Sequence, residues 1–312
     1  MAARGIAPRL TPRRSVAAAP HPERLAHMDR RSIIADDGRE LNAFVACAHP
    51  DAPVVVVVLP FGARHAMLNG FYDALRSRFT VVTWESRFVL DVERDDDEAG
   101  IAALTHARDL ASVIRATARR GRHEPVDVIA YCSGAGVALL AAQHYPDAIS
   151  RLVLVSGEYL LPAAVAAQTD IQRQMDIFLS LAAKSRSVAG SIQEKIAAAQ
   201  ERGQTGFHTH LREPFSSARH LHRYGINYLA YRGVDLREVA RQVAHPALSI
   251  VSTADMHVDP AGSLDISRLL RRCARNVCVT GDHYEICRGN ADIVDSVVAF
   301  LVTGEATLRA VF

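Results

Sequence analysis

The chain has 312 residues, a formal net charge of +2 and 49% hydrophobic residues. It can bury a large core, either as one large domain with an insertion or as two smaller domains. The near balance of acidic and basic residues argues against a dedicated nucleic-acid-binding protein, which usually carries a basic excess. No apolar run approaches the roughly 18 residues that suggest a membrane span. The five cysteines are scattered, with no CxxC pair and no zinc-like spacing, which favours a reducing, cytoplasmic setting.

The N-terminal residues 1–30 are rich in Arg, Ala and Pro and contain no long apolar stretch. We therefore expect no secretory signal here, and the likeness to a transit peptide is weak. We expect a disordered tail here.

The predicted elements begin with a β-hairpin over residues 31–47, whose turn is formed by residues 36–38. In chain order there follow a strand at 53–59, a helix at 66–78, a strand at 79–84, an acidic loop at 91–98, a helix at 105–121, a strand at 126–131, a helix at 134–144, strands at 151–156, 247–252 and 276–280, and a closing helix at 293–302. Short β-branched strands that alternate with helices predict an α/β fold with a mostly parallel sheet.

The alternation of strands and helices is interrupted once, between residues 161 and 235. This stretch reads as helical and contains no convincing strand. An insertion between two strands of such a sheet lies above their carboxyl ends, where ligands bind. We therefore expect a core formed by residues 31–160 and 236–312, and a helical cap formed by residues 161–235.

The sequence around Cys132 predicts a strand, a sharp turn and a helix. Small residues crowd this turn, namely Ala130, Ser133, Gly134, Ala135 and Gly136. A nucleophile on a strained turn needs such neighbours, because large side chains would clash there. The helix that follows directs its N-terminus at Cys132, and its dipole favours a thiolate and a developing oxyanion. This pattern predicts a nucleophile elbow.

From about residue 31 onward, the sequence resembles the α/β-hydrolase superfamily. Members commonly carry Gly-x-Ser-x-Gly-Gly, an Ala-rich helix, His/Tyr-Pro-Asp and then a strand. The corresponding stretches here are 130–135, 137–143, 145–147 and 152–156. The resemblance implies an α/β-hydrolase fold with an eight-stranded, mostly parallel sheet flanked by helices. It places Cys132 at the nucleophile position. Ser133 is the alternative, but that register puts Tyr131 and Ala135 where small residues belong.

In this family the nucleophile is followed in the chain by an acid and then by a histidine. Asp255 follows the strand at 247–252, and His283 follows the strand at 276–280. We expect His283 to hold Cys132 as a thiolate or take its proton, and Asp255 to orient the imidazole. The alternatives are Asp259, Glu158 and Asp282 for the acid, and His257 and His65 for the histidine. His257 could instead contact the substrate.

An oxyanion hole requires two backbone N–H groups, and the family takes one from the residue after the nucleophile, here Ser133. The other is expected from the loop after the strand at 53–59. Pro60 and Phe61 stand there in place of the family's His-Gly pair. We assign the second donor to Phe61, with Gly62 as the alternative.

A cysteine nucleophile favours acyl transfer from a thioester, because the acyl-cysteine formed keeps a high group-transfer potential. The family includes members with cysteine here, among them dienelactone hydrolases, polyhydroxyalkanoate synthases and some biosynthetic thioesterases. With the cap, the resemblance implies a thioesterase, cyclase or acyltransferase that acts on a carrier-protein- or coenzyme A-bound acyl thioester. The alternatives are a hydrolase of small esters or lactones, and a degenerate hydrolase that acts as a binding module.

Other candidate residues receive plainer interpretations. His208 and His210, like His220 and His222, are spaced so that they diverge on a helix, and we expect neither a metal nor a cofactor. The helical spacing of Tyr224, Tyr228 and Tyr231 indicates packing. The remaining cysteines, Cys47, Cys273, Cys278 and Cys287, are interpreted as small buried residues. The sequence does not specify the oligomeric state.

Overall fold

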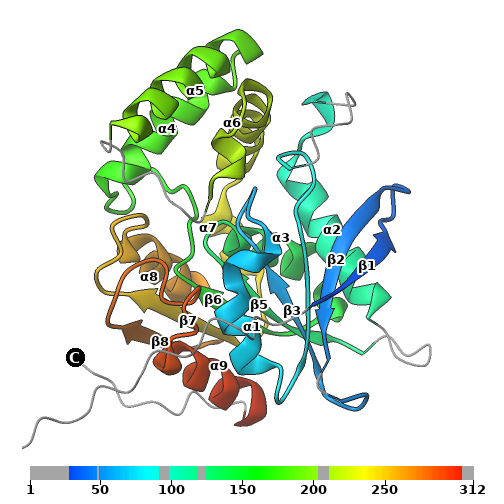
Figure 1. Cartoon of the computed structure of the whole chain (residues 1–312). Coiled ribbons are helices and arrows are strands. Elements are labelled where there is room, and N and C mark those ends of the chain that lie inside the picture. Colours follow the sequence, from blue (N-terminus) through cyan, green and yellow to red (C-terminus); the bar gives the residue numbers. More distant parts are fainter. Residues whose placement is uncertain (1–27, 48, 91–97, 118–123, 203–210, 304–312) are drawn as a thin grey trace, which may run out of the picture.

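The computed structural model describes residues 28–47, 49–90, 98–117, 124–202 and 211–303. This part of the chain forms one eight-stranded sheet with helices on both faces, and more helices lie beyond one end of the strands (Figure 1). Nearly all of the predicted tail and the predicted acidic loop lie outside the described residues.

The sheet has the order β1-β2-β4-β3-β5-β6-β7-β8. Its strands are β1 (Asp29–Ile34), β2 (Glu40–Ala46), β3 (Val54–Val58), β4 (Thr80–Trp84), β5 (Val126–Tyr131), β6 (Ile149–Val155), β7 (Ala247–Ser252) and β8 (Cys273–Val279). The strands β1 and β2 form the predicted hairpin, and β2 runs antiparallel to β4. All other neighbouring strands are parallel. The predicted fold class is therefore confirmed.

The central strands consist of β-branched residues because both of their faces are covered. The strand β3 is a run of five valines, and every residue of β4 is buried. Such continuous apolar runs are typical of parallel strands between two helix layers. The carboxyl ends of β3, β5, β6, β7 and β8 lie at the same edge, because these strands are mutually parallel.

Two helix layers cover the sheet. One layer contains α1 (Asn69–Leu75) and α9 (Ala291–Thr303), and the other contains α2 (Ala103–Ala116), α3 (Gly134–His144), α7 (Leu236–Gln242) and α8 (Pro260–Leu269). The predicted helix at 66–78 is instead a 3₁₀ turn, η1 (His65–Leu68), followed by α1. Neither α7 nor α8 was predicted from the sequence.

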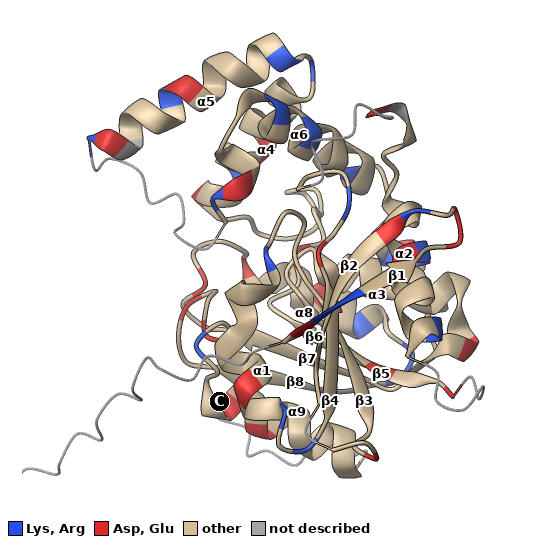
Figure 2. Cartoon of the chain, turned by 45° about the vertical axis from the view of Figure 1, so that its right-hand side comes forward, with Lys and Arg blue, Asp and Glu red and all other residues tan. Residues whose placement is uncertain are grey.

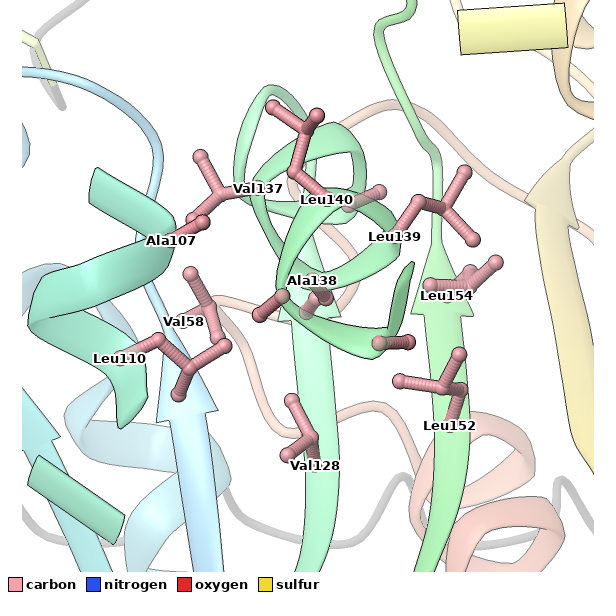
Figure 3. Close-up of a cluster of buried hydrophobic side chains, with 14 of the residues drawn as sticks. Val58, Ala107, Leu110, Val128, Val137, Ala138, Leu139, Leu140, Leu152 and Leu154 are labelled. Carbon is pink, nitrogen blue, oxygen red and sulfur yellow. The ribbon is translucent and has the colours of Figure 1, made fainter. Parts of the chain in front are cut away.

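Helix α3 is the centre of the second layer, and nine of its eleven residues are buried. A helix that is apolar on all sides needs cover on all sides. Here the cover comes from β3, β5 and β6 on one side and from α2 beside it (Figure 3). Helix α7 also packs against α3. Truncating a core residue such as Leu139 to alanine would cost about 2–5 kcal/mol of stability. The helix that follows Cys132 is thus held rigidly.

The residues between β6 and β7 form the helices that lie beyond the sheet in Figure 1. They are α4 (Asp170–Ala182), α5 (Arg186–Glu201), the 3₁₀ turn η4 (Glu213–Phe215) and α6 (Ala218–Arg232). Residues 161–235 are called the helical insertion below. Its helices pack together through Leu179, Ala189 and Leu221, which are fully buried. The described part of the insertion contains no strand.

Charged residues of both signs are interspersed over the helices and loops (Figure 2). Across the described ranges, no helix has both the length and the apolar character needed to cross a membrane.

Two cysteine interpretations are wrong, because Cys47 and Cys278 are exposed. Cys278 lies on β8, the last strand of the sheet, where no further strand covers it.

Candidate active site

Cys132 lies at a strained turn between β5 and α3. Its φ angle is 53°, in the left-handed region that residues other than glycine rarely adopt. The turn is fixed by backbone hydrogen bonds: the Cys132 N–H donates to Val155 O at 3.0 Å, and its carbonyl accepts from Ala135 at 3.0 Å and from Glu158 at 3.1 Å. The surrounding structure therefore holds the thiol at the end of the sheet.

The small residues of the turn are needed for close packing. A Cβ atom on Gly134 would lie 2.6 Å from the carbonyl oxygen of Val58, and one on Gly136 would lie 1.8 Å from the Tyr231 hydroxyl. Ala130 is completely buried. Larger residues at these positions would push the turn away from β3 and from the helical insertion.

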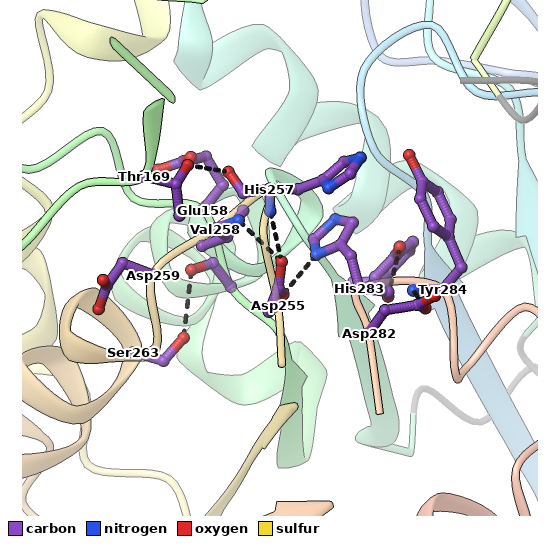
Figure 4. A network of polar contacts seen from close by, with 12 residues as sticks. Glu158, Thr169, Asp255, His257, Val258, Asp259, Ser263, Asp282, His283 and Tyr284 are labelled. Carbon is purple, nitrogen blue, oxygen red and sulfur yellow. Dashed lines mark hydrogen bonds and ion pairs between the residues drawn. The ribbon is translucent and has the colours of Figure 1, made fainter. Parts of the chain in front are cut away.

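His283 and Asp255 meet at the carboxyl ends of β8 and β7. The Nδ1 atom of His283 lies 2.6 Å from Oδ2 of Asp255, and both side chains are buried (Figure 4). The other oxygen, Oδ1, accepts from the backbone N–H groups of His257 at 2.8 Å and Val258 at 2.9 Å. With Nδ1 turned to Asp255, the opposite nitrogen of the ring is left for Cys132, with which the ring makes a hydrogen bond.

The environment favours a charged His283. Burial alone would lower its pKa, but the negative charge of a Cys132 thiolate and the hydrogen bond to Asp255 outweigh burial and raise the pKa to about 10. The ring is therefore an imidazolium near neutral pH for as long as the sulfur beside it carries a charge.

The alternative acids have other partners. Asp259 accepts from the N–H of Ala261 and caps α8. Asp282 accepts from the N–H of Tyr284 and from Arg288. The structure thus brings neither carboxylate to the His283 ring in the way that it brings Asp255.

The alternative histidines lie in different settings. His65 is bonded to Glu85 and stacked on Phe44, on the β2 side of the molecule. His257 stays in the site, where its ring stacks on that of His283. Glu158, an alternative acid, also remains at the site and faces the insertion through a hydrogen bond from Gln172.

The two candidates for the second oxyanion donor point in different directions. The Phe61 N–H donates to the hydroxyl of Ser133 at 3.1 Å, so it is directed at the elbow. The Gly62 N–H donates to Ser86 Oγ at 3.3 Å, away from Cys132. This geometry favours Phe61 over Gly62. The Ser133 N–H lies at the N-terminus of α3, where helical amides have no partner within the helix.

A cavity of about 130 Å³ opens above Cys132. Its lining from the core includes Phe61, Met67, Cys132, Ser133, Glu158, His257 and His283, and its lining from the insertion includes Ile171, Gln172, Met175, Leu179, Phe215, Tyr224, Tyr228 and Tyr231. The three tyrosines thus line a cavity in addition to packing, which the interpretation from their spacing did not include. Most of the other side chains are apolar, so the cavity suits an apolar group.

The histidine pairs of the insertion do not form a metal site in the described residues. His220 is bonded to Ser217 at its helix N-terminus, and His222 to the carbonyl of Ala182. His208 and His210 lie outside the described residues. Within the ranges that the structure describes, no three His, Cys, Asp or Glu side chains are placed to hold a metal ion.

Sequence reasoning missed the role of Gln172. With Thr169 it forms a capping box at the start of α4, and its side chain also contacts Glu158 and the N–H of Asp259. A Thr followed three residues later by Gln, just before an apolar helix, was the available signal.

Comparisons with known proteins agree with this fold. The family model described as serine aminopeptidase, S33, matches residues 103–285, more than half of the chain. No curated protein sequence matches. Among solved structures, the chain is similar to an enol-lactonase from Burkholderia xenovorans LB400, with a TM-score of 0.66, 18% identity, and coverage of 87% of this chain and 99% of that one.

Two further solved structures show the same fold. A thermophilic esterase from Thermogutta terrifontis has a TM-score of 0.64 at 16% identity and covers 88% of this chain and 98% of its own. A hydrolase from Pseudomonas aeruginosa has a TM-score of 0.65 at 17% identity, with 88% and 99% covered. The chain is a hydrolase-type α/β enzyme, and it belongs to the serine aminopeptidase S33 family of α/β-hydrolases.

Proposed function

We propose that the protein is an acyl-transfer enzyme, a thioesterase, cyclase or acyltransferase, that acts on an acyl thioester through a covalent acyl-Cys132 intermediate. The observation that carries the proposal is the alignment of Cys132, His283 and Asp255. A thiol on a left-handed turn shares a hydrogen bond with an imidazole, and a buried carboxylate orients that imidazole. Nucleophile, base and orienting group are the three parts of covalent acyl transfer.

In the acylation step, the Cys132 sulfur attacks the carbonyl carbon of the thioester. The C–S bond to Cys132 forms, the C–S bond to the leaving thiolate breaks, and His283 gives its proton to that thiolate. The N–H groups of Ser133 and Phe61 would stabilise the oxyanion. The Ser133 hydroxyl, to which Phe61 donates in the resting site, must then turn aside or donate to the oxyanion itself.

Acylation changes the state of His283. The thioester sulfur carries no charge, so the largest of the causes that raise the pKa of His283 disappears. The neutral ring can then act as a general base toward water or another acceptor. The contact between Cys132 and His283 therefore keeps the imidazole charged before acylation. After acylation it leaves the imidazole neutral and able to accept a proton.

We further propose that residues 161–235 act as a cap. The insertion supplies α4 and α6 side chains to the cavity above Cys132, so it would determine which acyl group fits. The Cys132 thiol would be kept reduced in the cytoplasm. A carrier protein or coenzyme A would deliver the acyl group, and no metal or cofactor takes part in these steps.

A second candidate function is hydrolysis of a small ester or lactone. It is favoured by the solved structures to which the chain is similar, which include an enol-lactonase and an esterase. The two candidates differ in the leaving group. Turnover of matched thioester and oxoester analogues separates them, since only the first candidate predicts a strong preference for the thioester.

The experiment that tests the proposal is intact-protein mass spectrometry after incubation with a panel of acyl thioesters. The wild type should gain the mass of the acyl group, and Cys132→Ala should gain nothing. Ser133→Ala is the matched control, because it removes the neighbouring nucleophile and leaves the thiol. An adduct that persists in Cys132→Ala, or one lost in Ser133→Ala alone, would move the nucleophile to Ser133. An inert thiol in every assay would favour the degenerate binding module.

A further inference from the structure

Glu158 is a carboxylate in the wall of a mostly apolar cavity. Of the described residues that line this cavity, it is the only one that is Asp, Glu, Lys or Arg. One of its oxygens accepts from the N–H of Leu160 at 2.9 Å, and the other accepts from Nε2 of Gln172 at 2.8 Å. Both donors are neutral. Burial raises the pKa of Glu158, which the two hydrogen bonds and the charge of His283 only partly oppose.

The loop that holds Glu158 is strained and tied to the nucleophile. The Glu158 N–H donates to the carbonyl of Cys132 at 3.1 Å. On either side, Ser156 and Leu160 have φ angles of 44° and 50°, which are unfavourable for residues other than glycine. The Tyr231 hydroxyl donates to the Glu158 carbonyl at 2.8 Å. Strain of this kind is retained where surrounding contacts fix it, most often at functional sites.

Aromatic rings line the same cavity as the carboxylate. Tyr224, Tyr228 and Tyr231 of α6 line the same cavity. Burial raises the pKa of each, and the charge of Glu158 contributes to the increase in all three. A carboxylate among electron-rich rings is the arrangement that recognises an ammonium group.

The charges of the site also favour a cation. Among the described residues that line the first cavity, no Lys or Arg is present to neutralise Glu158, and His283 is already bonded to Asp255. A buried charge without a partner is costly, and a ligand that supplies the opposite charge removes this cost. An ammonium ion at Glu158 would do so.

We propose that Glu158 binds a primary ammonium group carried by one of the two reactants. This inference rests on the acyl-transfer function proposed above and names a chemical class for its substrate. Glu158 also lines a second cavity of about 630 Å³, which shares Leu160, Gln172 and Tyr228 with the first. An ammonium group can therefore come from an amino-terminated acyl chain in the first cavity or from an amine acceptor in the second.

If the ammonium group belongs to the acceptor, Glu158 also takes part in the chemistry. The carboxylate removes one proton from the ammonium ion, which leaves a free amine. The amine nitrogen attacks the acyl carbon, the C–N bond forms, and the C–S bond to Cys132 breaks. The second proton passes to neutral His283, which restores the thiolate and imidazolium pair, and Glu158 returns its proton to solvent.

The first experiment measures binding and needs no turnover. Hexylammonium and 1-hexanol are titrated into Cys132→Ala protein by calorimetry, with and without Glu158→Gln. We expect Glu158→Gln to weaken hexylammonium binding by roughly 10- to 100-fold relative to hexanol, which is typical of a lost charge-assisted hydrogen bond. Equal effects on both ligands would overturn the proposal.

The second experiment distinguishes the two sources of the ammonium group. The rate of thioester loss is compared for 6-aminohexanoyl- and heptanoyl-N-acetylcysteamine. Acyl transfer from heptanoyl-Cys132 is compared for hexylamine, which gives the amide, and hexanol, which gives the ester. In each comparison, the rate for the charged compound is divided by the rate for the uncharged one. The comparison in which Glu158→Gln lowers this ratio identifies the source of the ammonium group. No change in either ratio would count against the inference.

A control separates charge from structure. Gln172→Leu removes the hydrogen bond from Gln172 to Glu158 but keeps the carboxylate, so it should preserve the preference for the ammonium compound. Loss of the preference in this variant would show that Glu158→Gln acts through the loop. If the wild type forms no heptanoyl adduct at all, the proposed function fails, and the calorimetric result still decides the ammonium site.

Discussion

The rings of His257 and His283 lie nearly parallel, with centroids 5.4 Å apart and an interplanar angle of 12° (Figure 4). Tyr131 packs near the same His283 ring at 5.0 Å. The His257 carbonyl also accepts from the hydroxyl of Thr169, at the start of α4. His257 therefore connects the imidazole to the helical insertion, and its ring restrains that of His283.

We expect this restraint to affect the rate of acylation. His257→Ala should slow formation of the Cys132 adduct by roughly tenfold, because the His283 ring gains freedom to leave its productive orientation. His257→Phe keeps a flat ring and should remain within about threefold of the wild type. Time-resolved intact-mass measurements provide both rates. If the phenylalanine variant is as slow as the alanine variant, the imidazole of His257 acts chemically.

Replacing Asp255 tests the orientation of His283. Asp255→Asn should lower the acylation rate by about 10³- to 10⁴-fold, because an amide favours the wrong tautomer of the ring. Asp259→Asn is the matched control in the same loop. Asparagine caps a helix as well as aspartate does, so this variant should change the rate and the stability little. A large rate loss in Asp259→Asn would reassign the acid.

The fold was predictable where local sequence and burial agree. The valines of β3 predicted a strand correctly, and the small residues around Cys132 predicted a sharp turn where Cys132 has a φ angle of 53°, since steric demands act within a few residues. Helix α7 has only seven residues and too few turns to show a period. Helix α8 begins with an Asp259-Pro260 start signal that was not used, because the segment was interpreted as an acid-bearing loop.

The candidate site was predictable only in part. Strand order places residues 132, 255 and 283 at the same edge of the sheet, and that much follows from family pattern and parallel topology. The contacts of Gln172 with Glu158 and Asp259 join segments about 14 and 87 residues away in the chain. No local pattern encodes such contacts, because they depend on how the insertion settles on the core.

The protonation of His283 should depend on the sulfur beside it. Its pKa of about 10 is above the unfolded value of roughly 6.5, so this group stabilises the fold fully below pH 6.5 and less as the pH rises toward 10. Cys132→Ala removes the thiolate and should lower the pKa of His283. Chemical shifts of the ring nitrogens, followed by NMR over pH, measure the change. An unaltered titration would show that Asp255 alone sets the pKa.

The elbow should not tolerate a methyl group at Gly134. Gly134→Ala places a Cβ atom against the Val58 carbonyl and should destabilise the protein by about 1–3 kcal/mol. Gly262 of α8 has no atom within 4 Å of the same position, so Gly262→Ala should stabilise by about 0.5–1 kcal/mol. Urea unfolding gives both values. A Gly134→Ala protein as stable as the wild type would show that α3 can shift away from β3.

A buried histidine should make stability depend on pH. Burial lowers the pKa of His106 to about 4, against the opposing effect of its hydrogen bond to Asn227. The unfolded chain binds more protons between pH 4 and 6.5, so the stability contributed by neutral His106 is present above pH 6.5 and falls toward pH 4. Between pH 6.5 and pH 4, the free energy of unfolding of His106→Gln should fall by about 3 kcal/mol less than that of the wild type. Burial raises the pKa of Asp109 to about 6, so Asp109 contributes to the pH dependence of stability with the opposite sign. Because the wild type and the variant both contain Asp109, this contribution is the same in both proteins and drops out of the difference between them.

The hydrogen bonds at the start of α4 also determine how a substrate can enter. Gln172 to Glu158, Asp259 to Gln172 and Thr169 to His257 all cross from the insertion to the loops beside Cys132. Each of these hydrogen bonds contributes about 1 kcal/mol. Breaking all three makes the state in which this end of the insertion is separated from the core roughly a hundredfold less populated. The opposite margin, where Pro214 of η4 rests on Gly62, is held there by van der Waals contact and by one exposed ion pair, Glu213 with Arg64 at 3.7 Å, which contributes little to stability. The helical insertion and the core therefore separate most easily at η4, and bulky acyl chains should enter beneath that turn.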